Sequence, residues 1–186
     1  MLRILLISLA FLAISGCELF EPRDPEPPTS SGLNFPPANS PDILFQNFIN
    51  AHREKVLEYY LACLADEITL SESYVFVPSS GAVNKYPSLS DWDKNSERIF
   101  FNNIISQSGD SQILLSLDNE QSNTFGDSAS YSYDYSISLP SSQETFEGSA
   151  RFVIRTDSRN VWFITRWEDY QVEDKLSWSD LKGLNY

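Results

Sequence analysis

The chain has 186 residues, which is enough for one ordinary globular domain and too few for two large ones. Its 26 acidic and 13 basic side chains give a formal net charge of -13, so we expect no nucleic-acid partner, because phosphate backbones would be repelled. One histidine and two cysteines exclude metal sites built from several of these residues; only an all-oxygen cation site stays open, and we expect no metal and no other cofactor.

The first seventeen residues have the pattern of a secretion signal. Arg3 precedes an apolar run over residues 4–13, which is too short to span roughly 30 Å of bilayer hydrocarbon. The run ends in Ile14-Ser15-Gly16-Cys17, which resembles the bacterial lipobox, where small residues precede a cysteine that receives diacylglycerol. The resemblance implies a signal peptide over residues 1–16 and a membrane anchor on Cys17. An ordinary secretory signal with an incidental cysteine is the alternative.

The residues that follow the lipobox bear on location. Glu18 stands where an aspartate would commonly signal retention in the inner membrane. We therefore expect a lipid-anchored protein of the bacterial cell envelope, in the outer membrane and facing the periplasm or the cell surface. Lipidation of Cys17 leaves Cys63 as the single free thiol, and the apolar pattern around Cys63 favours a buried core residue over a reactive one.

Residues 17–39, which include the lipidated cysteine, are interpreted as a tether. Six of the ten prolines lie between Glu18 and Asn39. Proline lacks the N–H group that helices and sheets need, and it restricts the residue before it. We predict an extended spacer, partly in the polyproline II conformation, that holds a domain of residues 40–186 away from the lipid.

The domain is predicted to begin with helices. Ser40-Pro41-Asp42 combines an N-cap, a proline at the first helical position and an acid in the first turn. Apolar residues recur at helical spacing as far as Ala51, and a second apolar set covers residues 56–64 after the polar residues 52–55. We favour two helices joined by a tight turn over one bent helix.

The rest of the domain is predicted to be mostly strand. Ser90-Asp91-Trp92-Asp93 has the features of a helix cap, and that helix should stop near Gly109. Beyond it the hydrophobic period changes from 3.6 to 2, most clearly where tyrosines alternate with serines over residues 129–139. The predicted strands cover residues 74–77, 112–117, 129–139, 145–156 and 161–170.

Helices followed by long antiparallel strands predict an α+β fold, with the helices packed on one face of a strongly curved sheet. This order resembles the NTF2-like (SnoaL-like, cystatin-like cone) superfamily. The resemblance rests on residues 51–64 followed by 74–78, and on the closing strand over residues 162–169; residues 177–183 resemble the tail of tethered envelope lipoproteins in that superfamily. It covers roughly residues 40–183 and implies a conical pocket. A cystatin-like or lipocalin-like sheet would share the strand half.

Five aromatic residues are the candidates for the pocket or its rim: Tyr60, Trp92, Tyr133, Tyr135 and Trp167. The resemblance to ketosteroid isomerases implies an aspartate base beside a tyrosine, for which Asp66 and Asp169 are available, yet no motif maps onto those enzymes. Core packing of the tyrosines is the alternative. His52 lies in the polar stretch and is expected in a solvated turn rather than in catalysis.

The sequence favours a lipid-anchored protein without enzymatic activity that binds a small apolar molecule or an envelope protein through the cone or the sheet face. The alternative is a lipid-anchored isomerase, dehydratase or hydrolase that uses aspartate and tyrosine as acid and base. The resemblance also allows a homodimer through the open sheet face. Fold alone does not decide between these functions.

Overall fold

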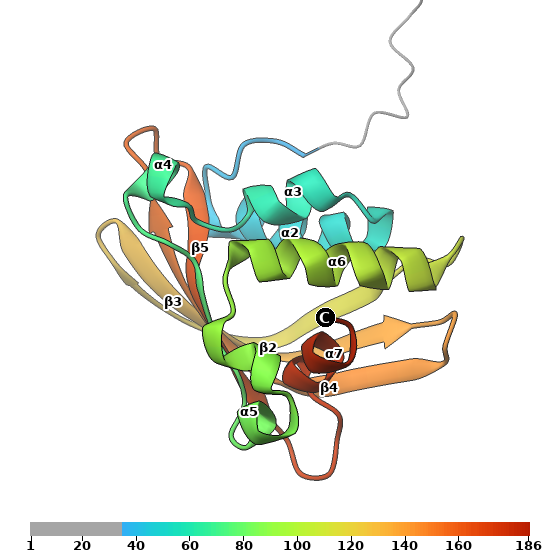
Figure 1. Ribbon diagram of the computed structural model, residues 1–186. Coiled ribbons are helices and arrows are strands. Elements are labelled where there is room, and N and C mark those ends of the chain that lie inside the picture. The colour runs from blue at the N-terminus through green and yellow to red at the C-terminus, as the bar shows by residue number, and fades with distance from the viewer. Residues whose placement is uncertain (1–34) are drawn as a thin grey trace, which may run out of the picture. The chain divides into compact units, whose positions relative to one another are not determined.

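The computed structural model describes residues 35–186 (Figure 1). The predicted signal peptide, Cys17 and residues 17–34 of the predicted tether lie outside the described residues. Within the described range, no helix is both long enough and apolar enough to cross a membrane.

The described residues form helices, one 3-10 helix and five strands. In chain order they are α2 (Pro41–Glu54), α3 (Leu57–Ala62), α4 (Glu67–Leu70), β1 (Val75–Val77), α5 (Ala82–Lys85), η2 (Pro87–Asp91), α6 (Lys94–Ser108), β2 (Leu114–Phe125), β3 (Ser128–Leu139), β4 (Glu144–Thr156), β5 (Trp162–Gln171) and α7 (Trp178–Leu184).

The first two helices form as predicted. The side chain of Ser40 accepts a hydrogen bond from the backbone N–H of Ile43 at 3.4 Å and caps α2. Lys55 ends α2 in the left-handed conformation, with φ of 56°, and Val56 is extended before α3 begins. This reversal confirms two helices joined by a tight turn, because a continuous helix would need right-handed backbone at both residues.

The cap of α6 differs from the prediction. Residues Pro87–Asp91 form the 3-10 helix η2, Trp92 is extended, and Asp93 is the N-cap, which accepts a hydrogen bond from the N–H of Ser96 at 2.8 Å. The prediction of Ser90 as the cap was wrong, since Pro87 already provides a helical start three residues earlier.

The five strands form one sheet in the order β1-β5-β4-β3-β2, in which β1 is parallel to β5 and the other pairs are antiparallel. Along β3 the tyrosines face the core and the serines face outward, as their alternation predicted. Register shifts interrupt the pairing at residues 118–121 and 153–154. Such irregularities bend a strand, and they accompany the strong curvature of this sheet.

Strand β2 extends eight residues beyond its predicted end, to Phe125. The segment Asp118-Asn119-Glu120 is polar and mostly exposed, so it lacks the alternating apolar residues by which strands are recognised. Because β2 lies at the edge of the sheet, its side chains need not alternate between core and solvent.

Helices α2, α3, α6 and α7 all lie on one face of the curved sheet (Figure 1). They enclose a core rich in aromatic side chains, among which Phe48, Phe152 and Trp167 are fully buried. The predicted α+β architecture is confirmed.

His52 corrects a prediction. Its side chain is fully buried rather than in a solvated turn, because α2 continues through residue 52 and turns it inward. Nδ1 lies 2.8 Å from the carbonyl oxygen of Phe48, and the rings of Tyr60, Phe101 and Trp178 surround the imidazole. Burial lowers the pKa of His52 to about 4, although the Phe48 hydrogen bond opposes this shift.

Candidate functional site

The interior of the cone is filled by helix α7. Trp178 is fully buried and packs edge-on against Trp167, with ring centroids 4.2 Å apart. It also contacts the rings of Phe48 and Tyr135. The space in which a cone-shaped pocket would hold a ligand is therefore occupied by a side chain of the same chain.

A buried hydrogen-bond network holds α7 in this position. The hydroxyl of Tyr135 donates to Oδ1 of Asp169 at 2.7 Å and accepts a bond from the N–H of Trp178 at 2.6 Å. Oδ2 of Asp169 accepts from the N–H and the hydroxyl of Ser179, at 2.8 and 2.5 Å. Burial, reinforced by the charge of Asp169, raises the pKa of Tyr135. The pair considered for acid-base chemistry thus anchors the first turn of α7.

An ion pair lies deeper in the cone. Lys182 of α7 and Glu97 of α6 are both fully buried, and Nζ of Lys182 contacts both carboxylate oxygens. The hydroxyls of Tyr60 and Tyr74 each donate to this carboxylate at 2.6 Å. Burial raises the pKa of both tyrosines, and the negative charge of Glu97 adds to the effect. The phenols therefore stay protonated and act as donors.

Four aromatic rings surround the ammonium group of Lys182. The distances from Nζ to the ring centroids are 4.3 Å for Trp167, 4.5 Å for Phe76, 4.7 Å for Phe100 and 5.1 Å for Trp92. All lie within the roughly 6 Å over which a ring face attracts a cation. Burial lowers the pKa of Lys182 to about 8, against the opposing attraction of Glu97.

The five residues predicted for the pocket or rim do not line one open pocket. Tyr60, Trp92 and Trp167 meet around the ion pair of Lys182 and Glu97, and Tyr135 lies beside Asp169. Tyr133 lies apart, where its hydroxyl donates to Glu120 at 2.9 Å beside a cavity of about 180 Å³ between α2 and β2.

Sequence reasoning missed Glu97, Lys182 and Tyr74 as parts of the interior. One local signal was available: Trp178 and Lys182 are four residues apart and so share a helix face with the apolar Leu181 beside them. A lysine on an apolar face normally extends its ammonium group to solvent, so the sequence alone favoured a surface position.

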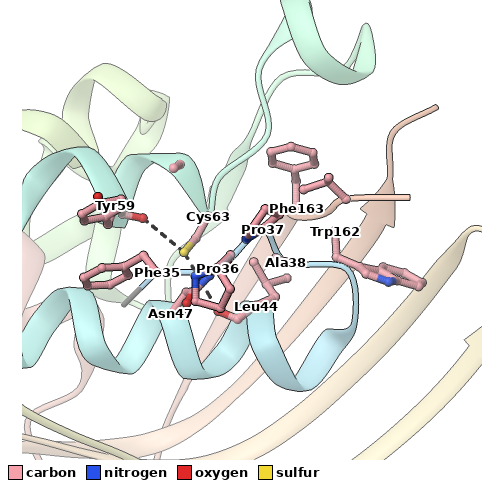
Figure 2. A pocket seen from close by; sticks show the side chains of 12 residues that line it. Phe35, Pro36, Pro37, Ala38, Leu44, Asn47, Tyr59, Cys63, Trp162 and Phe163 are labelled. Carbon is pink, nitrogen blue, oxygen red and sulfur yellow. Dashed lines mark hydrogen bonds between the residues drawn. The ribbon is translucent and has the colours of Figure 1, made fainter. Parts of the chain in front are cut away.

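A second hollow region lies where the N-terminal segment, residues 35–38, meets the domain (Figure 2). The ring of Phe35 stacks on Tyr59 at a centroid distance of 3.9 Å. The side-chain amide of Asn47 donates to the carbonyl oxygen of Pro36 at 2.8 Å. The backbone N–H of Trp162 donates to the carbonyl oxygen of Ala38, also at 2.8 Å. Contacts of the domain thus extend into the predicted tether.

This N-terminal cavity has a volume of about 260 Å³. It is lined by Phe35, Pro36, Pro37, Ala38, Leu44, Asn47, Tyr59, Ala62, Cys63, Val161, Trp162 and Phe163. The described residues of the lining are almost entirely apolar, and among them only the phenol of Tyr59 and the thiol of Cys63 can titrate. One polar atom lacks a partner: Oδ1 of Asn47 is buried and accepts no hydrogen bond within the described residues. Oδ1 has almost no accessible surface, so a donor on a ligand in the cavity reaches it only after the Asn47 side chain shifts.

The thiol of Cys63 lies in the wall of the N-terminal cavity and donates to the carbonyl oxygen of Tyr59 at 3.2 Å (Figure 2). Burial raises its pKa to about 12, and the charge of Lys94 opposes this only in part. The prediction that Cys63 is buried is confirmed, and a thiol with a raised pKa is a poor nucleophile at neutral pH. Within residues 35–186, no group of three or more His, Cys, Asp or Glu side chains is arranged to hold a metal ion.

Comparison with known proteins identifies the fold. The sequence matches no family model and no curated protein. Among solved structures, a candidate dehydratase of the NTF2-like family from Streptomyces avermitilis is 12% identical, with a TM-score of 0.57 over 73% of this chain and 95% of that one. The described domain has the NTF2-like fold.

Two further solved structures support this assignment. An NTF2-like protein of unknown function from Pseudomonas putida is 14% identical, with a TM-score of 0.52 over 72% of this chain and 87% of that one. A candidate ketosteroid isomerase from Parabacteroides distasonis is 12% identical, with a TM-score of 0.50 over 72% and 89%. Identities this low establish the NTF2-like fold and leave function to the site.

Proposed function

We propose that this protein is a lipid-anchored protein of the bacterial cell envelope whose NTF2-like domain binds a small apolar molecule in the N-terminal cavity without catalysing a reaction. The observation that carries the proposal is the contrast between two interiors. The cone, where acid-base chemistry would take place, is filled by α7, whereas the described residues that line the N-terminal cavity are almost all apolar and include no carboxylate or imidazole.

The size and lining of the N-terminal cavity define the ligand class. A cavity of roughly 150 Å³ holds one benzene molecule, so about 260 Å³ suits an aromatic molecule of one or two rings. Oδ1 of Asn47 calls for a single N–H or O–H group on that ligand. Indole has this combination, and it is a suitable probe.

The binding proposal is tested by filling the cavity. Ala62 lines the cavity and is exposed, so Ala62→Trp should occupy its space without disturbing the core. Glu58→Trp places the same side chain on an exposed position of α3 outside the lining and serves as the control. We expect the wild type and Glu58→Trp to bind indole by isothermal titration calorimetry, and Ala62→Trp to lose at least tenfold in affinity.

Methylation of the probe tests the role of Asn47. The compound 1-methylindole has the same rings as indole but lacks the N–H donor. We expect weaker binding of 1-methylindole, because Oδ1 of Asn47 would stay unpartnered. Equal binding of indole to Ala62→Trp and to the wild type would contradict the proposed cavity, and equal binding of the two probes would contradict the role of Asn47.

The lipid anchor is a separate part of the proposal and rests on Ile14-Ser15-Gly16-Cys17. We expect Cys17→Ser to release the protein from membranes, because two or more acyl chains are needed for stable anchoring. The measurement is the distribution of the protein between membrane and soluble fractions. Retention of Cys17→Ser in the membrane fraction would refute the anchor.

One observation favours a second candidate function, a lipid-anchored isomerase, dehydratase or hydrolase. Asp169 is buried within hydrogen-bonding distance of Tyr135, which also lines a surface cavity of about 260 Å³. Such a pair suits an acid and a base in an active site. Turnover of a small ketone or ester by the wild type, lost in Tyr135→Phe and kept in Tyr133→Phe, would support this function over binding alone.

A further inference from the structure

The base of the cone has the chemistry of a binding site for a cation. We use the term ammonium site for the carboxylate of Glu97, the hydroxyls of Tyr60 and Tyr74, and the rings of Phe76, Trp92, Phe100 and Trp167. Every one of these side chains lies within interaction distance of Nζ of Lys182 or of its carboxylate partner.

The walls of the ammonium site and the cation within it come from different parts of the fold. Glu97 and Phe100 belong to α6, Phe76 to β1 and Trp167 to β5. Only Lys182 belongs to α7, which follows β5 after a turn of mostly exposed residues, 172–176. The walls are thus supported by the sheet and α6, and α7 supplies the occupant.

The walls select for charge and for N–H donors. Glu97 lies in a fully buried position, where an unpaired carboxylate is strongly unfavourable. The two phenols already donate to Glu97, so the remaining interaction that its oxygens need is with a positively charged donor. The ring faces attract such a cation and exclude water from it. A neutral molecule of the same shape would leave the charge of Glu97 uncompensated.

We propose that the ammonium site recognises a primary alkylammonium group and that Lys182 is its resident ligand, supplied from within the chain. The contacts that define this recognition all involve Nζ of Lys182. A free ammonium ion of the same shape can make them without a covalent link to α7. A free alkylammonium ion therefore binds wherever the Lys182 side chain is absent. This site is distinct from the N-terminal cavity, and its test does not depend on indole binding.

The test is chemical rescue in the full chain. Lys182→Ala removes three methylene groups and the ammonium group, which are together the size of n-propylammonium. We expect the melting temperature to fall by about 10 °C, because the Glu97 carboxylate loses its partner. A saturating concentration of n-propylammonium chloride should raise the melting temperature of Lys182→Ala by about 5 °C and leave the wild type unchanged.

Two controls separate recognition of the ammonium group from non-specific effects of the additive on the melting temperature. The neutral analogue 1-propanol should fail to stabilise Lys182→Ala, since it cannot neutralise Glu97. Lys182→Met fills the same space with an apolar chain, so n-propylammonium should have no effect on it. Equal stabilisation by propanol and propylammonium, an equal response in the wild type or in Lys182→Met, or no response in Lys182→Ala would each overturn the proposal.

The proposal stays testable if Lys182→Ala does not fold alone. The variant is then refolded in the presence of n-propylammonium or of 1-propanol, and near-ultraviolet circular dichroism reports packing of the tryptophans. Recovery with the ammonium ion alone supports the site, and failure with both overturns it. The double variant Lys182→Ala with Glu97→Gln should lose the preference for the cation over the alcohol, because the selecting charge is gone.

Discussion

The base of the cone and the N-terminal cavity differ in both lining and contents. The cone base contains an ion pair, two phenols and an imidazole nearby, yet α7 fills it. The N-terminal cavity has about 260 Å³ of space and an almost wholly apolar lining. The titratable groups at the cone base therefore lie apart from the N-terminal cavity, which has room for a ligand. In this NTF2-like cone the buried charged groups contact one another, and removal of either partner would leave an uncompensated buried charge.

The largest effect that tests this difference is expected at Glu97. Glu97→Gln leaves Lys182 buried without a carboxylate, and we expect the free energy of unfolding to fall by about 4 kcal/mol. Glu147→Ala, which removes a surface ion pair with Lys175, should change stability by less than about 0.5 kcal/mol. Urea denaturation measures both. Similar effects in the two variants would show that burial does not separate these ion pairs energetically.

The second effect is a pH dependence from His52, whose pKa is about 4 in the folded domain and 6.5 when unperturbed. Between these values the unfolded chain binds a proton that the folded domain does not, so stability falls as the pH falls from 6.5 to 4. The loss is about 3 kcal/mol. Urea midpoints across this range should fall in the wild type and change much less in His52→Gln. Parallel curves for the two proteins would show that other groups cause the loss.

Two adjacent tyrosines provide a matched comparison of the cone with the N-terminal cavity. Tyr60 donates to the buried Glu97, so Tyr60→Phe should lower the free energy of unfolding by about 2 kcal/mol. Tyr59 stacks on Phe35 through its ring and is partly exposed, so Tyr59→Phe should cost less than about 0.5 kcal/mol. Thermal unfolding of the two variants gives the difference. A reversed order would place the stabilising contacts outside the cone.

Apart from the two control variants Glu147→Ala and Tyr59→Phe, the smallest effect is expected at Phe35. Phe35→Ala removes a stacked ring at a partly exposed site, and we expect a loss of about 1 kcal/mol. The same variant should bind indole more weakly, because one wall of the N-terminal cavity is lost. Calorimetry with indole and urea denaturation together measure both effects. Unchanged indole affinity would show that residues 35–38 do not form part of a binding site.

Local signals predicted much of the fold. The cap at Ser40 and the alternation along β3 depend on residues within a few positions of one another, and both appear in the structure as expected. The polar part of β2 was missed because an edge strand needs no apolar alternation. The burial of His52 was missed because residues 53–55, which follow it, are polar, whereas the rings that enclose it include Phe101 and Trp178 from distant elements.

The candidate site was predicted less well for a related reason. Tyr60, Trp92 and Trp167 were selected as aromatic residues, and they do meet in one place. What brings them together is the contact of Lys182 with Glu97, which are 85 positions apart. The spacing of Trp178 and Lys182 places Lys182 on an apolar helix face, but a single sequence does not show which distant charge pairs with it.

The position of α7 in the chain has a consequence for the order of folding. Residues 178–182 follow every strand and are among the last to be synthesised, so the contacts of Trp178 and Lys182 form only when nearly the whole chain is available. Until then the carboxylate of Glu97 lacks its cationic partner, and the apolar rings that contact Lys182 are not covered by α7. Chaperones bind exposed apolar surface of this kind, and a nascent domain in this state would remain open to them. Cooperative closure of the domain then coincides with the arrival of α7.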